Sequence, residues 1–428
     1  MISKLSQSIF LVLILTFFSC GNRSEKQKGL DTVHNSMTMS TDDAPIVLGS
    51  NRTAIYLPLL KNKKVGVVGN NTTVIYKLEE SSGTEAKKNY THLVDSLISL
   101  GVDVVKVFAP EHGFRGEEPN GAIIPDGIDP KTGLPSISLY KPKASRTSDG
   151  DNTKPTPEHL EGVDVLIFDI QDVGSRFYTY ISTLHYVMEA AAELDIPVIV
   201  LDRPNPTGHY IDGPILEPEH KSFVGMDLIP VVHGLTIGEY AKMLNGEKLL
   251  ANGIQADLTV IEMENYDHNK RYDPPLPPSP NLPNATAINL YPSLCFFEGT
   301  NVNEGRGTSK QFQVFGSPFL DPEVFPYSYV PEPNSASKTP KHNGETCYGR
   351  DLSENPRIDE INLDWLIEAY ENTSDKTKFF NESKFTRLAG TTKLQEQVES
   401  GMSSDEIKET WKDGLEKYAA IREKYLLY

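Results

Sequence analysis

The sequence predicts an α/β fold, in which a Rossmann-like parallel sheet with helices on both faces is followed by a smaller, mixed α+β C-terminal domain. Three observations predict it. Short runs that are apolar on both sides alternate with amphipathic helical patterns from residue 64 to residue 263. Six prolines then fall within residues 273–283, where the chain must run extended. Beyond them the pattern is mixed and rich in loop residues.

Each predicted strand is short, rich in Val and Ile, and without the polar alternation of a half-exposed strand. We expect strands over residues 64–70, 102–109, 163–170, 196–202 and 257–263. Amphipathic spacing indicates helices over residues 92–101, 181–194 and roughly 404–425. A further helix begins at Thr236, because Thr236 and Glu239 form a capping-box pattern.

Length and charge narrow the class of protein. The 428 residues, 38% hydrophobic and 23% charged, fit a globular protein of one large or two ordinary domains. Lys and Arg number 41 against 59 Asp and Glu, so the net charge is −18. This charge disfavours a nucleic-acid or anionic-lipid surface, because phosphate neutralisation needs clustered cations. It does not exclude a small acidic ligand, which a single arginine can bind.

The first twenty residues have the pattern of an export signal. Lys4 precedes the apolar run IFLVLILTFF, which is too short to span a bilayer. The run leads into Ser19, Cys20 and Gly21, which resembles a lipoprotein signal with Cys20 as the lipidated first residue. A plain secretory signal is the alternative. We therefore expect an exported, periplasm-facing lipoprotein that is anchored to a membrane only through its lipid.

The chain divides into four predicted parts. These are a lipoprotein-type signal peptide (1–20), a polar, flexible tether (21–45), a Rossmann-like catalytic domain (46–265) and a smaller C-terminal domain that completes the cleft (266–428). Without the signal peptide and Cys20, Cys295 and Cys347 are the remaining cysteines, and their spacing leaves open whether they pair.

Polar side chains follow four of the predicted strands. Open parallel sheets bind ligands beyond the carboxyl ends of their strands, so these side chains indicate one shared cleft. They are Asn70 and Asn71; Glu111 and His112; Asp169, Asp172, Arg176 and Tyr178; and Arg203 and Asn205.

The common catalytic motifs are missing from the sequence. The turn after residues 64–70 lacks the G-x-G-x-x-G pattern of dinucleotide sites, and the chain has no Walker lysine motif, H-E-x-x-H or G-x-S-x-G. A metal site from Asp169, Asp172 and a histidine stays open, although the spacing matches no familiar ligand pattern. A cleft with carboxylates, Arg, Asn, Tyr and His suits sugar hydrolysis, in which a protonated carboxyl gives its proton to the leaving oxygen.

Several segments resemble the NamZ-like exo-β-N-acetylmuramidases, in the same order along residues 50–428. The segments are VFAPEHGFRGEEPNG, DVLIFDIQDVGSRFYTYI, VLDRPNPTG, PVVHGLTIGEYA, PPSPNLP, SLCFFEGTNVNEGRGT and IREKYLLY. The resemblance implies a Rossmann-like domain, a smaller C-terminal domain and a cleft between them. It also implies a hydrolase that needs no cofactor and removes N-acetylmuramic acid from the non-reducing end of peptidoglycan fragments, which are glycans of N-acetylmuramic acid and N-acetylglucosamine. The chain departs from the family at VGVVGNNTT, where Thr-Asn-Gln-Thr-Gly is more usual.

Within this resemblance, Glu111 is the leading candidate for the catalytic carboxyl; its alternative role is a salt bridge to Arg115 or His112. His112 is expected to orient Glu111 or the sugar. Asp172 is a second catalytic candidate. It and Asp169 follow the same strand, and one of them would hold a sugar hydroxyl or face the reacting centre. Glu304, in a glycine-rich loop, is the other candidate for a second carboxylate. Retaining, inverting and substrate-assisted mechanisms all remain open.

N-acetylmuramic acid differs from N-acetylglucosamine by a lactyl ether with a carboxylate, and recognition of that group calls for a planar, bidentate cation. Arg176, beside Tyr178, is the first candidate, and Arg306 from the C-terminal domain is the second. The other expected substrate contacts are Asn70, Asn71, Arg203, Asn205 and His233. Two competing functions remain. One is a non-catalytic muropeptide-binding lipoprotein, and the other is a nucleotide-dependent transferase, which the missing phosphate loop weakens.

Overall fold

A seven-stranded sheet forms the centre of the structure, a computed structural model that describes residues 44–77, 90–116, 122, 125–140 and 153–428. The strand order is β5-β6-β4-β1-β7-β8-β9, and every neighbouring pair except β5 and β6 is parallel. Counted along the chain, the parallel strands follow the 3-2-1-4-5-6 order of a Rossmann fold. The strands are β1 (Lys64–Gly69), β4 (Asp103–Ala109), β5 (Gly127–Ile128), β6 (Pro135–Ser138), β7 (Val165–Asp169), β8 (Val198–Leu201) and β9 (Leu258–Ile261).

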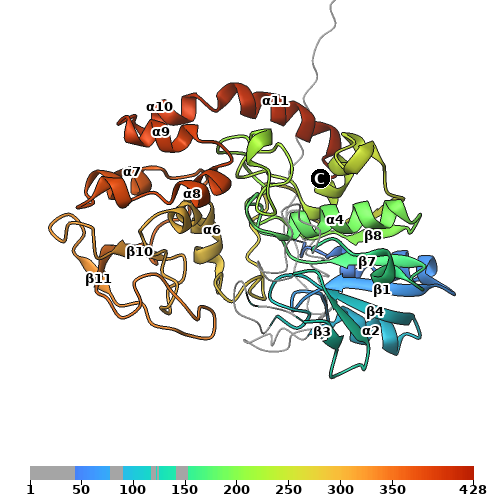
Figure 1. The fold of residues 1–428 in the computed structure, drawn as a ribbon. Helices are drawn as coiled ribbons and strands as arrows, with labels where there is room; N and C mark the ends of the chain where they lie inside the picture. The colour runs from blue at the N-terminus through green and yellow to red at the C-terminus, as the bar shows by residue number, and fades with distance from the viewer. Residues whose placement is uncertain (1–43, 78–89, 117–121, 123–124, 141–152) are drawn as a thin grey trace, which may run out of the picture. The chain divides into compact units, whose positions relative to one another are not determined.

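Successive side chains of the buried strands enter two separate hydrophobic cores, because their directions alternate along a strand. On β7, Val165 and Ile167 belong to one core, and Leu166 and Phe168 belong to the other. The first core is covered by α1 (Thr53–Tyr56) and α2 (Leu93–Ser99), and the second by α4 (Tyr180–Glu193) and α5 (Ile237–Gly246). Figure 1 shows α2 and α4 on opposite sides of the strands. The predicted sheet with helices on both faces is confirmed.

The five predicted strands are present as β1, β4, β7, β8 and β9, with slightly shorter bounds. The capping box before α5 is also present: the Thr236 hydroxyl accepts a hydrogen bond from the Glu239 N–H, and the Glu239 carboxylate accepts one from the Thr236 N–H. The pattern did not predict the antiparallel pair of β2 (Val74–Tyr76) and β3 (Tyr90–His92), nor the edge strand β5 and its neighbour β6. These strands are too short to show a clear periodicity.

The single helix predicted over residues 404–425 is wrong. The segment forms α10 (Ser404–Glu409) and α11 (Lys412–Arg422), which separate at Thr410 and Trp411. There the N–H groups of Thr410 and Trp411 donate to carbonyls only three residues back, so the ladder of α-helical hydrogen bonds is interrupted.

The smaller C-terminal domain combines helices with a three-stranded antiparallel sheet of order β10-β12-β11. Its elements before α10 are α6 (Ala285–Leu294), β10 (Val314–Ser317), β11 (Tyr327–Tyr329), β12 (Cys347–Asp351), α7 (Asp364–Glu371), α8 (Glu382–Ala389) and α9 (Lys393–Glu399). The remaining short helices of the described chain are α3 (Pro157–Leu160), η2 (Gly49–Asn51), η3 (Leu57–Leu60), η5 (Pro218–His220), η6 (Ala251–Gly253), η7 (Cys295–Gly299), η8 (Lys376–Lys378) and η9 (Glu423–Tyr425). Cys295 and Cys347 are both buried, and they do not pair.

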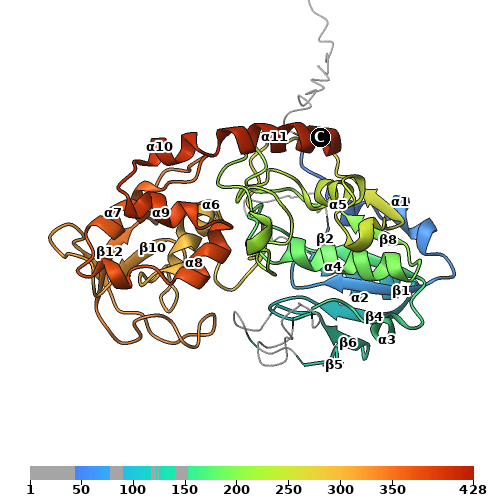
Figure 2. The same cartoon turned by 45° about the horizontal axis from the view of Figure 1, so that its top comes forward.

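The C-terminal helix returns to the sheet domain. Figure 2 shows α10 and α11 following one another from the helices of the C-terminal domain toward α5. The Tyr418 hydroxyl donates to the His233 carbonyl, and the Arg422 guanidinium donates to the Gly234 carbonyl. At the chain end, the Tyr428 hydroxyl donates to the buried carboxylate of Asp202 at 2.8 Å. These contacts join the two domains on the side of β8.

The predicted signal peptide, Cys20 and nearly all of the predicted tether lie outside the described residues. Among the helices that the structure does describe, none is both long enough and apolar enough to cross a membrane. Residues Pro45–Tyr428 form one unit.

Candidate active site

The turn after β4 directs Glu111 and His112 away from the sheet edge. Pro110 ends the strand, and its carbonyl accepts a hydrogen bond from the Gly113 N–H at 3.0 Å. His112 has a φ of 72° and Gly113 a φ of 82°. A positive φ is unfavourable for a histidine, and such strain is tolerated where the surrounding structure holds it, most often at functional sites. The predicted position of both side chains at a strand end is therefore confirmed, and the backbone there is strained.

Glu111 and His112 line a cavity of about 890 Å³, within the usual range for small-molecule sites. Its wall comes from the end of β4, the start of α4, the loop 221–226, the proline-rich segment, the region from α6 to Phe312, and α8. The polar residues of the wall are Glu111, His112, Thr179, His185, Glu189, Lys221, Ser222, Ser279, Asn281, Glu298, Arg306, Lys384 and Arg387, and the tyrosines are Tyr140, Tyr178, Tyr186 and Tyr291.

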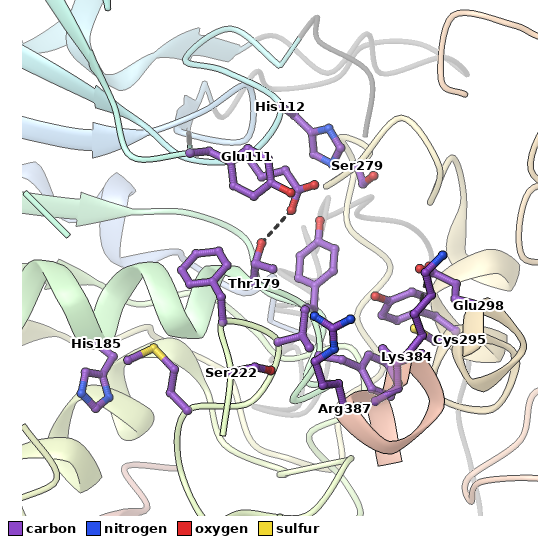
Figure 3. Close-up of a pocket in the computed structure, with 18 of the residues that line it drawn as sticks. Glu111, His112, Thr179, His185, Ser222, Ser279, Cys295, Glu298, Lys384 and Arg387 are labelled. Carbon is purple, nitrogen blue, oxygen red and sulfur yellow. Dashed lines mark hydrogen bonds between the residues drawn. The ribbon is translucent and has the colours of Figure 1, made fainter. Parts of the chain in front are cut away.

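Thr179 holds the Glu111 carboxylate. Its hydroxyl donates to Glu111 Oε2 at 3.0 Å, and this bond is drawn in Figure 3. Thr179 is the N-cap residue of α4, but its side chain makes no capping bond to the helix. A threonine before a helix is usually interpreted as a cap, so the sequence analysis missed this residue. Arg115, the alternative partner predicted for Glu111, instead bonds Asp129 at 2.8 Å and Asp95 at 3.3 Å.

Tyrosine hydroxyls at the cavity wall and beside it form hydrogen bonds with a backbone carbonyl of the proline-rich segment. The Tyr178 hydroxyl donates to the Pro278 carbonyl at 2.8 Å, and the Tyr180 hydroxyl lies 3.1 Å from the same oxygen. Burial, together with the neighbouring Tyr180 and Tyr291, raises the pKa of Tyr178 well above its usual value, so its hydroxyl keeps its proton. The structure thus places Tyr178 in the cavity, as predicted, as a neutral side chain.

Arg306 lies on the cavity wall, as predicted, but it is engaged by two acids. Its guanidinium bonds Glu298 at 2.7 Å and Glu304 at 2.9 Å, and its Nη1 atom is buried without a hydrogen-bond partner. Glu304 is 2% exposed, is also bonded by Lys341 at 3.1 Å, and does not line the cavity. The hypothesis that Glu304 is a second catalytic carboxylate is therefore wrong, because its carboxylate lies beneath the wall, between two cations.

The assignment of Arg176 to a substrate carboxylate is wrong. Arg176 is 0% exposed and does not line the cavity. Its guanidinium donates to the backbone carbonyls of Pro214, Ile229, Leu388 and Ala389 at 2.7–3.0 Å. Burial lowers the pKa of Arg176 to about 9. Its donors therefore bind the last turn of α8 and the loop beside it, not a ligand.

The side chains after β1, β7 and β8 form hydrogen bonds or ion pairs within the protein. Arg203 bonds both carboxylate oxygens of Asp169, at 2.6 and 2.9 Å, and both residues are buried. Asn70 bonds Tyr180 and Thr72, Asn71 bonds the Pro277 carbonyl, and Asn205 bonds Leu235 and Thr207. Asn70, Asn71, Asp169, Arg203 and Asn205 are not among the described residues that line the cavity, so their substrate contacts stay predictions. The ion pair also removes Asp169 from the alternative metal site.

Asp172 and His233 are brought together, but not at the cavity wall. Asp172 Oδ2 accepts the Gly174 N–H at 2.7 Å and lies 3.5 Å from His233 Nε2. His233 Nδ1 accepts the Leu235 N–H, so the ring carries its proton on Nε2, on the side of Asp172. Asp172 Oδ1 is buried and has no hydrogen-bond partner among the described residues. The catalytic role predicted for Asp172 and the sugar contact predicted for His233 have no access to the cavity here.

The sequence analysis missed the two cations that α8 contributes to the cavity, Lys384 and Arg387. Figure 3 shows both side chains on the wall opposite Glu111, with the Arg387 guanidinium directed into the space that the Glu111 carboxylate also faces. They are three residues apart on one side of a helix, and no acid occupies a position three or four residues from either. Two basic residues on one side of a helix, without an acid at these positions, are the sequence signal that could have indicated a binding role.

Comparisons with known proteins agree with this architecture. The model of the N-terminal part of exo-β-N-acetylmuramidase NamZ matches residues 65–286, and that of its C-terminal part matches residues 289–428. The peptidoglycan β-N-acetylmuramidase NamZ of Bacillus subtilis (strain 168) is 38% identical over 392 residues, which cover 87% of this chain and 89% of the relative.

Two solved structures of DUF1343 family proteins from Bacteroides fragilis NCTC 9343 are similar to this fold. One is 42% identical with a TM-score of 0.78, and the other is 28% identical with a TM-score of 0.72. Each match covers 90% of this chain and 99% of the solved chain. Both halves of the chain are thus matched, and the chain belongs to the NamZ family of exo-β-N-acetylmuramidases.

Proposed function

We propose that this protein is an exo-acting glycoside hydrolase that releases terminal β-linked N-acetylmuramic acid from the non-reducing end of peptidoglycan fragments, with Glu111 as its catalytic carboxyl. Membership of the NamZ family supports the reaction. The observation that carries the role of Glu111 is its place at the strand end on the wall of the 890 Å³ cavity. β4 is the neighbour of β1, and the strand order of this sheet reverses between β1 and β7. Ligands of such sheets bind beyond the carboxyl ends of the strands, where Glu111 lies.

The other acids of the cavity wall are held by cations. Glu189 bonds Lys154 at 2.7 Å, and Glu298 bonds Arg306 at 2.7 Å. An acid in a close ion pair is stabilised as the anion and is a poor proton donor. Glu111 accepts a hydroxyl bond from Thr179 at 3.0 Å. Among these three carboxyls, Glu111 is the one that follows a strand of the parallel sheet, so we assign the proton donor to Glu111.

The reaction needs a proton at the glycosidic oxygen and water at the anomeric carbon. The protonated Glu111 carboxyl gives its proton to the glycosidic oxygen as the bond from that oxygen to C1 breaks. Water supplies the hydroxyl that C1 gains and the proton that restores the carboxyl. His112, next to Glu111 in the strained turn, orients this carboxyl or the sugar.

The test compares a chromogenic β-N-acetylmuramide with the matching β-N-acetylglucosaminide. The wild-type protein should release the chromophore from the first, and Glu111→Gln should lower kcat by about 10²–10⁴-fold, the usual contribution of an acid–base group. The exposed Glu219→Gln is the matched control and should retain full activity. Binding of the muramide without turnover by the wild-type protein would instead favour the muropeptide-binding lipoprotein.

We further propose that the protein is exported and held at a membrane, facing the periplasm, by a lipid on Cys20. The apolar run before Ser19, Cys20 and Gly21 supports this proposal. In cells grown with labelled palmitate, the wild-type protein should carry the label and sediment with membranes. Cys20→Ala should lose both properties, and an unlabelled wild-type protein in the soluble fraction would contradict the proposal.

A further inference from the structure

Helix α8 presents an apolar face to the core and a basic edge to the cavity. Phe385, Leu388 and Ala389 are buried, whereas Lys384 and Arg387 are exposed and line the cavity. The helix begins at a cap, in which the Asn381 side chain accepts the Lys384 N–H. Its axis also lies close to η7: a Cβ built on Gly299 would fall 2.5 Å from the Phe385 Cα. The backbone below the basic edge is therefore held tightly.

The sheet domain fixes the other end of this helix. The carbonyls of Leu388 and Ala389, in the last turn of α8, both accept hydrogen bonds from the Arg176 guanidinium. A buried cation at a helix C-terminus satisfies carbonyls that have no partner within the helix and is favoured by the helix dipole. Arg176 is thus a positioning residue, since it joins the β7–α4 loop of the sheet domain to the helix that carries Arg387.

The basic edge keeps its positive charge toward the cavity. In the part of the chain that the structure describes, neither Lys384 nor Arg387 forms a salt bridge with an acid, in contrast to Arg306, whose charge is balanced by Glu298 and Glu304. Within the described residues, the Arg387 side chain donates one hydrogen bond, from Nε to the Ser383 carbonyl at 3.0 Å. Its two Nη atoms remain available for a ligand. An uncompensated guanidinium inside a cavity calls for an anion.

We propose that Arg387, assisted by Lys384, binds the lactyl carboxylate of N-acetylmuramic acid and so selects this sugar over N-acetylglucosamine. The inference rests on the proposed function and names the residue that gives it specificity. The planar guanidinium can donate two parallel hydrogen bonds to the carboxylate, which a lysine cannot do. The C-terminal domain thus recognises the lactyl group, while the sheet domain supplies Glu111 on the opposite wall.

The test uses three chromogenic substrates: the β-N-acetylmuramide, its lactyl methyl ester and the β-N-acetylglucosaminide. Arg387→Ala should raise KM for the acid about 10- to 100-fold, because hydrogen bonds to charged groups contribute at this level, and should leave kcat nearly unchanged. KM for the ester and the glucosaminide should not change. Arg387→Lys should recover part of the loss, and the exposed Lys393→Ala on α9 is the matched control.

Calorimetric binding of free N-acetylmuramic acid and its methyl ester separates this inference from the proposed function. If the wild-type protein hydrolyses the muramide but Arg387→Ala retains its preference for the acid over the ester, the inference is overturned and the function stands. If neither protein hydrolyses any substrate, the function fails. Tighter binding of the acid than of the ester, lost in Arg387→Ala, would then still support the role of Arg387. Equal binding of both ligands to the wild-type protein would overturn it.

Discussion

The polar residues that follow β4 and those that follow β7 and β8 belong to the same sheet but lie in different surroundings. After β4, Glu111 and His112 face the cavity. After β7 and β8, Asp169 and Arg203 face each other and are buried. Both sets are polar, and both lie at the carboxyl edge where ligands are expected. A charged residue with a complementary partner across the neighbouring strand becomes part of the structure. The difference teaches that position at a strand end nominates a residue, whereas its access to the cavity decides its role.

The strongest test of this comparison is Arg203→Met. It leaves Asp169 as an unpaired carboxylate in the interior and should destabilise the fold by about 3–5 kcal/mol. Glu111→Gln, in contrast, should abolish most activity at nearly unchanged stability. Chemical denaturation measures the first effect and kinetics the second. An Arg203→Met protein of wild-type stability but without activity would show that the second strand end also serves the substrate.

Arg176→Met extends the test to the cation that joins β7 to α8. Four buried carbonyls lose their donor, so we expect a loss of about 2–4 kcal/mol of stability. Because α8 then loses an anchor, KM for the muramide should rise as well. If Arg176→Met changed KM but not the melting temperature, Arg176 would contact the substrate after all.

His185 shares a feature with each set of residues. It lines the cavity, and it also forms a 3.0 Å contact with the buried Asp227. Burial lowers its pKa, but the hydrogen bonds and charges of Asp227 and Glu189 outweigh this and raise the pKa to about 9. The other groups packed around this cluster are Lys154, bonded to Glu189, and Tyr240, bonded to Asp227.

A histidine whose pKa is higher in the folded protein binds its proton more tightly there, so it stabilises the fold fully below the unfolded pKa of about 6.5. This stabilisation is lost as the pH rises through about 9. The melting temperature should therefore fall by a few degrees, on the order expected for this size, between pH 7 and pH 9.5. The His185→Gln variant should melt lower at pH 7 and show a flatter pH dependence. An unchanged slope would indicate that His185 is neutral in the fold.

The smallest expected effect belongs to Thr179→Val. It removes the hydroxyl that bonds Glu111 and keeps the shape of the side chain, so kcat/KM should fall about 10-fold, equivalent to the loss of one hydrogen bond. Stability should stay close to wild type, because the hydroxyl does not cap α4. If the melting temperature fell together with the activity, Thr179 would have a structural role instead.

The sequence was informative where the pattern is long and local. Apolar runs such as 163–170 predicted the strands, and Thr236 with Glu239 predicted the start of α5. The proline-rich segment was expected to run extended, but it turns at residues 279–282. Its carbonyls are acceptors for Asn71, Tyr178 and Tyr180. Its contacts could not be predicted, because they join residues that lie far apart in sequence.

By itself, the sequence determined the parallel sheet and its helical cover, since side-chain periodicity is a local property. It nominated Glu111 through the resemblance to the NamZ family together with the strand end. Only the tertiary structure decided which arginine meets the cavity. Arg176 and Arg387 have the same chemistry, and each lies near glycine or aromatic residues in the sequence. One is enclosed by four carbonyls and the other is open to the cavity. The physical reason is that burial and pairing depend on neighbours brought from up to 213 residues away, and these neighbours exist only once the chain has folded.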